Sequence, residues 1–157
     1  MAIDGSEMAG LTLMSVEIVC DRRGDLLPNP EQDPIQIIAV SVSQEGSYAP
    51  PQRMIILANG EFEPKQFRFS GCFEYRVLRN ESELLDAFVS CLCSFDPDIV
   101  LAYDLSARAS IGYMCVRAYS VYKRNLELEL GRIAVSKRGK FGTIITTYLL
   151  CCKGKLF

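Results

Sequence analysis

The order of the apolar segments along the chain constrains its fold most strongly. Four short segments rich in β-branched and apolar residues come first, as expected of β-strands, at 11–20, 35–43, 53–58 and 73–78. A helical pattern, a short apolar segment at 99–103 and a second helical pattern follow. Strands in succession followed by helix, strand and helix are typical of an α/β domain with a mixed sheet. Because 35–43 is almost continuously apolar, we expect that strand to be buried on both faces.

The two expected helices each carry one apolar face. Asn80 with Glu83 three residues later resembles a capping box, with Asn in place of the usual Ser or Thr. The first apolar stripe, which we expect in the core, consists of Leu84, Leu85, Phe88, Val89 and Leu92. The second consists of Ile111, Met114, Cys115, Ala118 and Tyr122. Asp104 and Ser106 are expected to cap the start of the second helix.

The length of 157 residues, with 49% hydrophobic content, favours one compact domain. Residues 1–9 carry acids and no secretory apolar segment, and we interpret them as a flexible leader. The domain is expected to occupy 10–133. Residues 134–157 form a divergent tail, in which 144–150 has the composition of a strand without an assigned place. No apolar run reaches the roughly 20 residues of a membrane helix, so no membrane contact is expected.

Seven cysteines and no histidine limit the possible chemistry. An odd number of cysteines without a secretory signal favours reduced thiols, and we interpret Cys20, Cys72 and Cys115 as small hydrophobic residues. Cys91 and Cys93 lie two residues apart in an expected helix, so their side chains should point to different faces. Tetrahedral zinc needs four ligands, so without histidine we expect no zinc site. The lack of histidine also excludes Ser-His-Asp and Cys-His nucleophiles.

Three segments occur in the order seen in family B DNA polymerases. They read LTLMSVEI at 11–18, PNPEQDPIQ at 28–36 and DPDIVLAYD at 96–104. Together they resemble the exonuclease-like domain that precedes the polymerase palm, an RNase H-like mixed sheet flanked by helices. The zeta catalytic subunits are the nearest branch, since their first motif also looks like Ser-x-Glu. The resemblance covers about 10–133 and implies a domain truncated at its C-terminus, from a truncated gene model or a splice product.

The resemblance also implies where the remnants of an exonuclease site lie. Active relatives hold two divalent ions between carboxylates. Their first motif, Asp-x-Glu on a strand, is Ser15-x-Glu17 here, and a hydroxyl is a poorer ligand for a hard cation. In the second motif Asp104 takes an asparagine position, and the ligand position falls on Ala109 or Ser110. The third motif, a Tyr and Asp on a C-terminal helix, is absent, because the tail contains no acid.

Two other acidic pairs are expected to be structural. Asp96 and Asp98 flank a proline where a helix meets a strand, and Glu61 and Glu63 lie in a loop. The formal net charge of -2 gives no general attraction for nucleic acid, so any DNA contact must be local. We expect a solvated face, with local DNA contact as the alternative, at the basic residues Lys123, Arg124, Arg132, Lys137, Arg138 and Lys140.

The resemblance therefore implies a nuclear fragment of a zeta-type polymerase, active in translesion synthesis and DNA repair. Its exonuclease-like domain would be inactive, with a structural or DNA-guiding role. The expected partners are DNA, the polymerase palm and accessory subunits. The parent protein resembles a DNA-directed DNA polymerase, whereas the fragment alone is not expected to be an enzyme. No cofactor is expected, except Mg²⁺ if residual exonuclease activity remains.

Two alternatives stay open. The first is an active metal-dependent 3′-5′ exonuclease that uses Glu17, Asp104 and an acid not yet placed. The second is an unrelated α/β interaction domain. The fold distinguishes the second alternative, since the polymerase resemblance requires the strands beginning near Leu11, Ile35 and Arg53 to be neighbours in one sheet, with the strand at Ile99 added to it.

Overall fold

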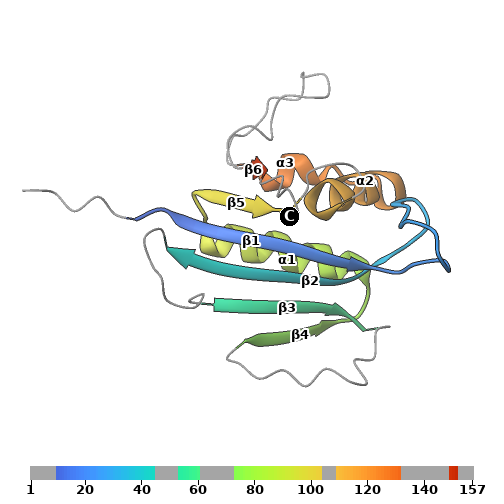
Figure 1. The fold of residues 1–157 in the computed structure, drawn as a ribbon, viewed down its shortest axis with the longest axis horizontal. Coiled ribbons are helices and arrows are strands. Elements are labelled where there is room, and N and C mark those ends of the chain that lie inside the picture. The colour runs from blue at the N-terminus through green and yellow to red at the C-terminus, as the bar shows by residue number, and fades with distance from the viewer. Residues whose placement is uncertain (1–9, 45–52, 61–72, 104–108, 132–148, 152–157) are drawn as a thin grey trace, which may run out of the picture.

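The computed structural model describes residues 10–44, 53–60, 73–103 and 109–131, and the backbone of 149–151. These residues form a six-stranded sheet with the order β4-β3-β2-β1-β5-β6 (Figure 1). The strands are β1 (Thr12–Cys20), β2 (Ile35–Gln44), β3 (Arg53–Asn59), β4 (Glu74–Leu78), β5 (Ile99–Ala102) and β6 (Leu149–Cys151). The helices are α1 (Glu81–Phe95), α2 (Ser110–Tyr122) and α3 (Leu126–Leu130).

The expected α/β class with a mixed sheet is confirmed. Strand β2 runs antiparallel to β1 and β3, while the pairs β1–β5, β3–β4 and β5–β6 are parallel. Strands β1, β2 and β3 are neighbours and β5 joins β1, as the polymerase resemblance requires. The strand expected at 144–150 lies mostly outside the described residues, but 149–151 pair with β5.

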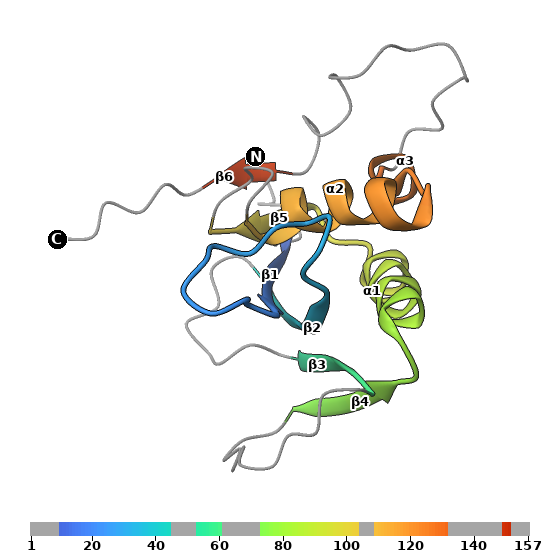
Figure 2. The same ribbon diagram turned by 90° about the vertical axis from the view of Figure 1, so that its right-hand side faces the viewer.

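The described helices cover one face of the sheet (Figure 2). Met14 and Val16 of β1 are fully buried beneath them, whereas Ser15 between them is half-buried and Glu17 is exposed. Strand β2 alternates in the same way, with buried residues at 38, 40 and 42 and half-buried residues at 37, 39 and 41. The expectation that β2 is buried on both faces is therefore wrong. Its apolar composition does not reveal that the described helices pack on one side only.

Helix α1 begins as the sequence predicts. The Asn80 side chain accepts a hydrogen bond from the Glu83 N–H at 3.0 Å, and the Glu83 carboxylate accepts one from the Arg79 N–H at 3.1 Å. Glu83 thus reaches the residue before the cap, a variation on the capping box. Of the predicted stripe, Leu84 and Phe88 have no exposed surface.

Helix α2 begins differently from the prediction. Its first residue is Ser110, and Ala109 occupies the cap position without a side-chain hydrogen bond. The expected cap by Asp104 and Ser106 is therefore wrong, and both of those residues lie outside the described part of the chain. The predicted apolar face is confirmed except for Tyr122, which is 37% exposed. Helix α3, with five residues, was not predicted from the sequence.

The cysteines whose side chains the structure describes behave as small hydrophobic or surface residues. Cys91 is buried and Cys93 is exposed, which confirms that they lie on different faces of α1. Burial raises the pKa of Cys115 to about 12 and that of Cys20 to about 11. Both thiols therefore stay protonated at neutral pH, as expected of packing residues. Cys72 lies outside the described residues.

The junction between α1 and β5 uses its acids structurally. Asp96 ends α1 in the left-handed conformation, with φ of 41°. The Asp98 carboxylate accepts a hydrogen bond from the Thr12 N–H at 2.8 Å, and the Asp98 N–H donates to the Thr12 carbonyl at 2.9 Å. The turn role predicted for these acids is confirmed, and Asp98 fixes the start of β1. Glu61 and Glu63 lie outside the described residues.

Candidate functional site

The candidate site lies on β1, on the face of the sheet turned away from α1 and α2. Strand alternation places Ser15 and Glu17 on this face together. Glu17 pairs with Ala39 of β2, while Ser15 lies between Ser41 of β2 and Leu101 of β5. Neither residue therefore has an acid as its direct cross-strand neighbour.

The backbone between these two residues is bound by the start of α2. Pairing between β1 and β5 covers only 13–15, because β5 ends at Ala102. Beyond that point the Ser110 hydroxyl donates a hydrogen bond to the Val16 carbonyl at 3.0 Å. Ser110 is 4% exposed and has φ of 45°, an unusual backbone conformation for serine. The structure thus brings Ser110 to the residue that separates Ser15 from Glu17.

The other predicted site positions contribute less to this arrangement. Ala109 is half-buried at the cap position of α2 and carries no polar side chain. Asp104 lies outside the described residues. Of the positions expected for a vestigial exonuclease site, Ser15, Glu17 and Ser110 are therefore gathered around one point of β1.

The described residues of this site offer few ligands for a metal ion. Glu17 contributes an exposed carboxylate. Hard divalent cations are bound by several oxygen ligands, usually including carboxylates. Within the described ranges, no group of three Cys, Asp or Glu residues is arranged to hold an ion. The oxygen atoms of Glu17 and Ser15 can form hydrogen bonds with a ligand or together bind one cation weakly. Phosphoryl chemistry with two metal ions needs further carboxylates.

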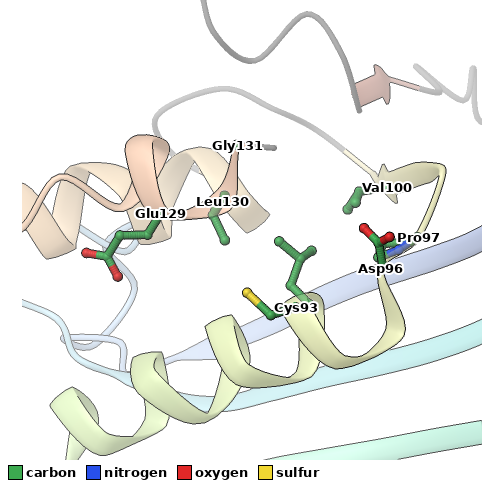
Figure 3. Close-up of a pocket in the computed structure, with 8 residues that line it drawn as sticks. Cys93, Asp96, Pro97, Val100, Glu129, Leu130 and Gly131 are labelled. Carbon is green, nitrogen blue, oxygen red and sulfur yellow. The ribbon is translucent and has the colours of Figure 1, made fainter. Parts of the chain in front are cut away.

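A small pocket lies on the helix side of the sheet, away from Glu17 (Figure 3). Its volume is about 210 Å³, below the roughly 300 Å³ at which small-molecule sites usually begin. It is lined by Leu92, Cys93, Asp96, Pro97, Val100, Glu129, Leu130 and Gly131. The mostly apolar lining and small size make it a packing defect between α1 and α3 rather than a catalytic centre.

The basic cluster is only partly described. Lys123 is exposed, whereas Arg124 binds the Asp86 carboxylate at 2.5 Å and also the Glu129 carboxylate. The positive charge of Arg124 is therefore matched by two acids on α1 and α3. The remaining members of the cluster lie outside the described residues. None of the described helices is long and apolar enough to cross a membrane.

One group of polar contacts was not anticipated from the sequence. The loop between β1 and β2 is tied to both long helices through Glu81 and Arg117, which form a buried ion pair at 2.6 Å. A glutamate at the start of a helix is normally interpreted as a favourable charge at a helix N-terminus. The signal that could have identified the pair is an arginine at a position of α2 whose spacing faces the core.

Comparisons with known proteins agree with the fold. A family model described as "DNA polymerase family B, exonuclease domain" matches residues 2–148. The DNA polymerase zeta catalytic subunit of Arabidopsis thaliana is 31% identical over 109 residues, which cover 69% of this chain and 6% of that protein. The DNA polymerase delta catalytic subunit of Schizosaccharomyces pombe is 31% identical over 128 residues, covering 82% of this chain and 11% of that protein.

These matches also show how much of the relatives the chain represents. It spans about a tenth or less of the length of either catalytic subunit. The mixed sheet with helices is consistent with the RNase H-like 3′-5′ exonuclease fold. Because the family model covers nearly the whole chain and both relatives align with its larger part, the protein belongs to the family B DNA polymerases and represents their exonuclease domain.

Proposed function

We propose that this chain is part of a zeta-type catalytic subunit whose exonuclease domain has lost nuclease activity. The domain would then serve as structure or as a guide for DNA during translesion synthesis and repair. The observation that carries the proposal is the composition of the site on β1. Ser15 stands where an active relative would carry a carboxylate, and the Ser110 hydroxyl is committed to the Val16 carbonyl.

The chemical reason is the requirement for two metal ions. One ion activates the attacking water and both stabilise the phosphoryl transition state, so each missing carboxylate weakens both ions. With Glu17 as its remaining first-motif acid, the site cannot bind two cations tightly through that motif. Loss of excision suits lesion bypass, because a proofreading enzyme would remove the nucleotide that it had just inserted opposite damaged DNA.

The partners and location follow from the longer protein. We propose that DNA, the polymerase palm and accessory subunits contact this domain within a zeta-type complex in the nucleus. Magnesium would matter to the domain only if residual exonuclease activity remained. The assignment to zeta rather than delta rests on Ser15-x-Glu17, since the identity to the two relatives is equal.

An active exonuclease is the second candidate, and the exposure of Glu17 favours it. An exposed carboxylate on a strand can still reach a cation in solution. In that case an acid outside the described residues, with Asp104 as the first candidate, would supply the missing ligand.

A nuclease assay separates the two candidates. The purified chain is incubated with 5′-labelled single-stranded DNA and Mg²⁺, beside a Glu17→Ala variant prepared in the same way. We expect no shortening of the DNA from its 3′ end by either protein. Degradation by the wild type that disappears in Glu17→Ala would overturn the proposal and establish the active exonuclease. Degradation that persists in the variant would identify a contaminating nuclease, which repurification removes before the comparison is repeated.

A further inference from the structure

The loop between β1 and β2, residues 21–34, is ordered by polar contacts rather than by apolar packing. Asp33 is its only buried residue. The carboxylate of Asp33 accepts hydrogen bonds from the Asn29 N–H at 2.8 Å and from Arg23 Nε at 2.7 Å. Leu26 and Leu27, in the middle of the loop, are 60% and 75% exposed and add little packing energy.

Helix α2 holds the second half of this loop at two points. The Tyr113 hydroxyl donates to the Asp33 carbonyl at 2.6 Å. Arg117 Nη1 donates to the Pro30 carbonyl at 3.0 Å. These bonds join residues more than 75 positions apart in the sequence, so they fix the loop to the helix layer rather than within itself.

Arg117 is itself held by a buried carboxylate. Glu81 at the start of α1 is 4% exposed and Arg117 is 7% exposed. The Glu81 carboxylate accepts from Arg117 Nε at 2.6 Å, Arg117 Nη2 at 2.8 Å, the Tyr122 hydroxyl at 2.8 Å and the Ile35 N–H at 2.7 Å. Such a fully hydrogen-bonded pair is the arrangement in which a buried ion pair is tolerated.

The protonation states favour the same geometry. Burial, together with the hydrogen bond to Glu81, raises the pKa of Tyr122 to about 12, so its hydroxyl remains a donor at neutral pH. Burial lowers the pKa of Arg117, but the hydrogen bond and charge of Glu81 outweigh it and keep the guanidinium charged. The two side chains that donate to Glu81 therefore keep their protons at neutral pH.

We propose that residues 21–34 form a strap, that the Glu81–Arg117 pair is its latch, and that breaking the latch opens the strap while the sheet stays folded. The reason is the contrast in what holds each part. Strands β2 and β3 are held by the apolar core, whereas the strap has one buried residue, and that residue is polar. Segments with few buried apolar contacts open locally at lower free energy than the core. Figure 2 shows this segment between the ends of β1 and β2, with its first half extending to the side away from α1 and its second half passing α2.

This conformational device is independent of whether the exonuclease site is active. It also gives the strap, which begins directly after the strand that carries Ser15 and Glu17, two states that differ at a defined pair of side chains. In the closed state Leu26 and Leu27 are presented in a fixed position. In the open state that position is lost, while the rest of the domain persists.

Hydrogen exchange measured by mass spectrometry on the full chain tests the proposal. The variant carries Glu81→Gln together with Arg117→Met, because removing Arg117 alone would leave a buried charge unpaired. Amides of the strap, including those of Gln32 and Asp33 that bond to the Asn29 carbonyl, should exchange about ten- to a hundredfold faster, as expected for losing hydrogen bonds to charged groups. Amides of β3, and those of β2 after Ile35, whose own N–H bonds to Glu81, should change by less than about threefold, since the core is retained.

Arg124→Met is the matched control. It removes an arginine that joins α1 to α3, and the acids that its side chain binds, Asp86 and Glu129, both lie outside the strap. Strap exchange should be unchanged in this variant. Equal acceleration of strap and sheet in the double variant would show that the latch belongs to the global core and would overturn the proposal. Unchanged strap exchange would overturn it as well.

A milder substitution keeps the test decisive if the double variant does not fold. Tyr113→Phe removes only the hydroxyl that bonds to the Asp33 carbonyl and keeps the ring in the core. Strap amides should then exchange about three- to tenfold faster, as expected for one neutral hydrogen bond, with the sheet unaffected. Protection equal to that of the wild type would contradict the strap.

Discussion

Ser110 supplies a hydrogen bond that β5 would supply if that strand continued. The parallel ladder stops after Ser15, and the next carbonyl of β1 is met by a side chain instead. A buried carbonyl without a partner is costly, so the hydroxyl has a clear structural role. This role does not depend on metal ions or on nuclease activity.

Ser110→Ala should therefore lower the free energy of unfolding by about 1–2 kcal/mol, because it leaves the Val16 carbonyl unsatisfied. Urea unfolding followed by circular dichroism measures this change. Ser90→Ala is a suitable control, since the Ser90 hydroxyl bonds to the Asp86 carbonyl on the exposed side of α1. It should cost less than about 0.5 kcal/mol. Equal effects of the two substitutions would contradict the structural role of Ser110.

We expect the ionisation of Asp33 to determine how the stability of the strap depends on pH. The Asn29 N–H and then Arg23 hold the pKa of this carboxyl below its usual value, against the opposing effect of burial. Because the folded-state pKa is the lower one, the stabilisation is present above the unfolded-state pKa of about 3.9 and is lost as the pH falls through the folded-state value.

Asp33→Asn should accordingly flatten the loss of stability below about pH 4. The measurement is urea unfolding at a series of pH values between neutral and acid. Asp25→Asn removes an exposed carboxylate from the same loop and should retain the steep wild-type profile. If the profile of Asp33→Asn instead ran parallel to that of the wild type, the ion pair with Arg23 would not contribute to acid sensitivity.

At the level of elements, the sequence correctly predicted the start of a helix where that start is stabilised by contacts between neighbouring residues. The start of α1 was predictable because Asn80 and Glu83 act within four residues of each other. The start of α2 was not, because its first residue bonds to a strand 94 positions away. Helix α3 was missed since five residues are too few to establish a periodic pattern.

The cap of α1 is a direct test of this local contribution. Asn80→Ala removes the acceptor for the Glu83 N–H and should destabilise the domain by about 1 kcal/mol. Thermal and urea unfolding both report this change. Asn80→Ser keeps an acceptor at the same position and should cost only a few tenths of a kcal/mol. A larger loss for Ser than for Ala would show that Asn80 acts through something other than capping.

On the scale of the whole molecule, the order of the apolar segments predicted the class of the fold, and the resemblance to family B polymerases implied the neighbours of β1. The sequence did not predict that β2 is buried on one face, since apolar composition is the same whether helices lie on one side or both. Nor did it predict the Glu81–Arg117 pair, whose partners are 36 positions apart in the sequence and meet only in the folded domain. For the candidate site, the sequence predicted that Ser15 and Glu17 lie on one face of the strand. It did not predict that the Ser110 hydroxyl would donate a hydrogen bond to the Val16 carbonyl between them.

The bond between Ser110 and Val16 has a consequence for the descent of this domain. If an ancestor carried a metal-binding acid at position 110, its replacement by serine removed a metal ligand and also added a hydrogen bond to the Val16 carbonyl. A substitution back to an acid at that position would first lose the bond and bury a charge, before a restored acid at position 15 could help bind an ion. On the proposed function, an acid at position 110 would therefore be selected against on folding grounds, and lost excision would be difficult to restore.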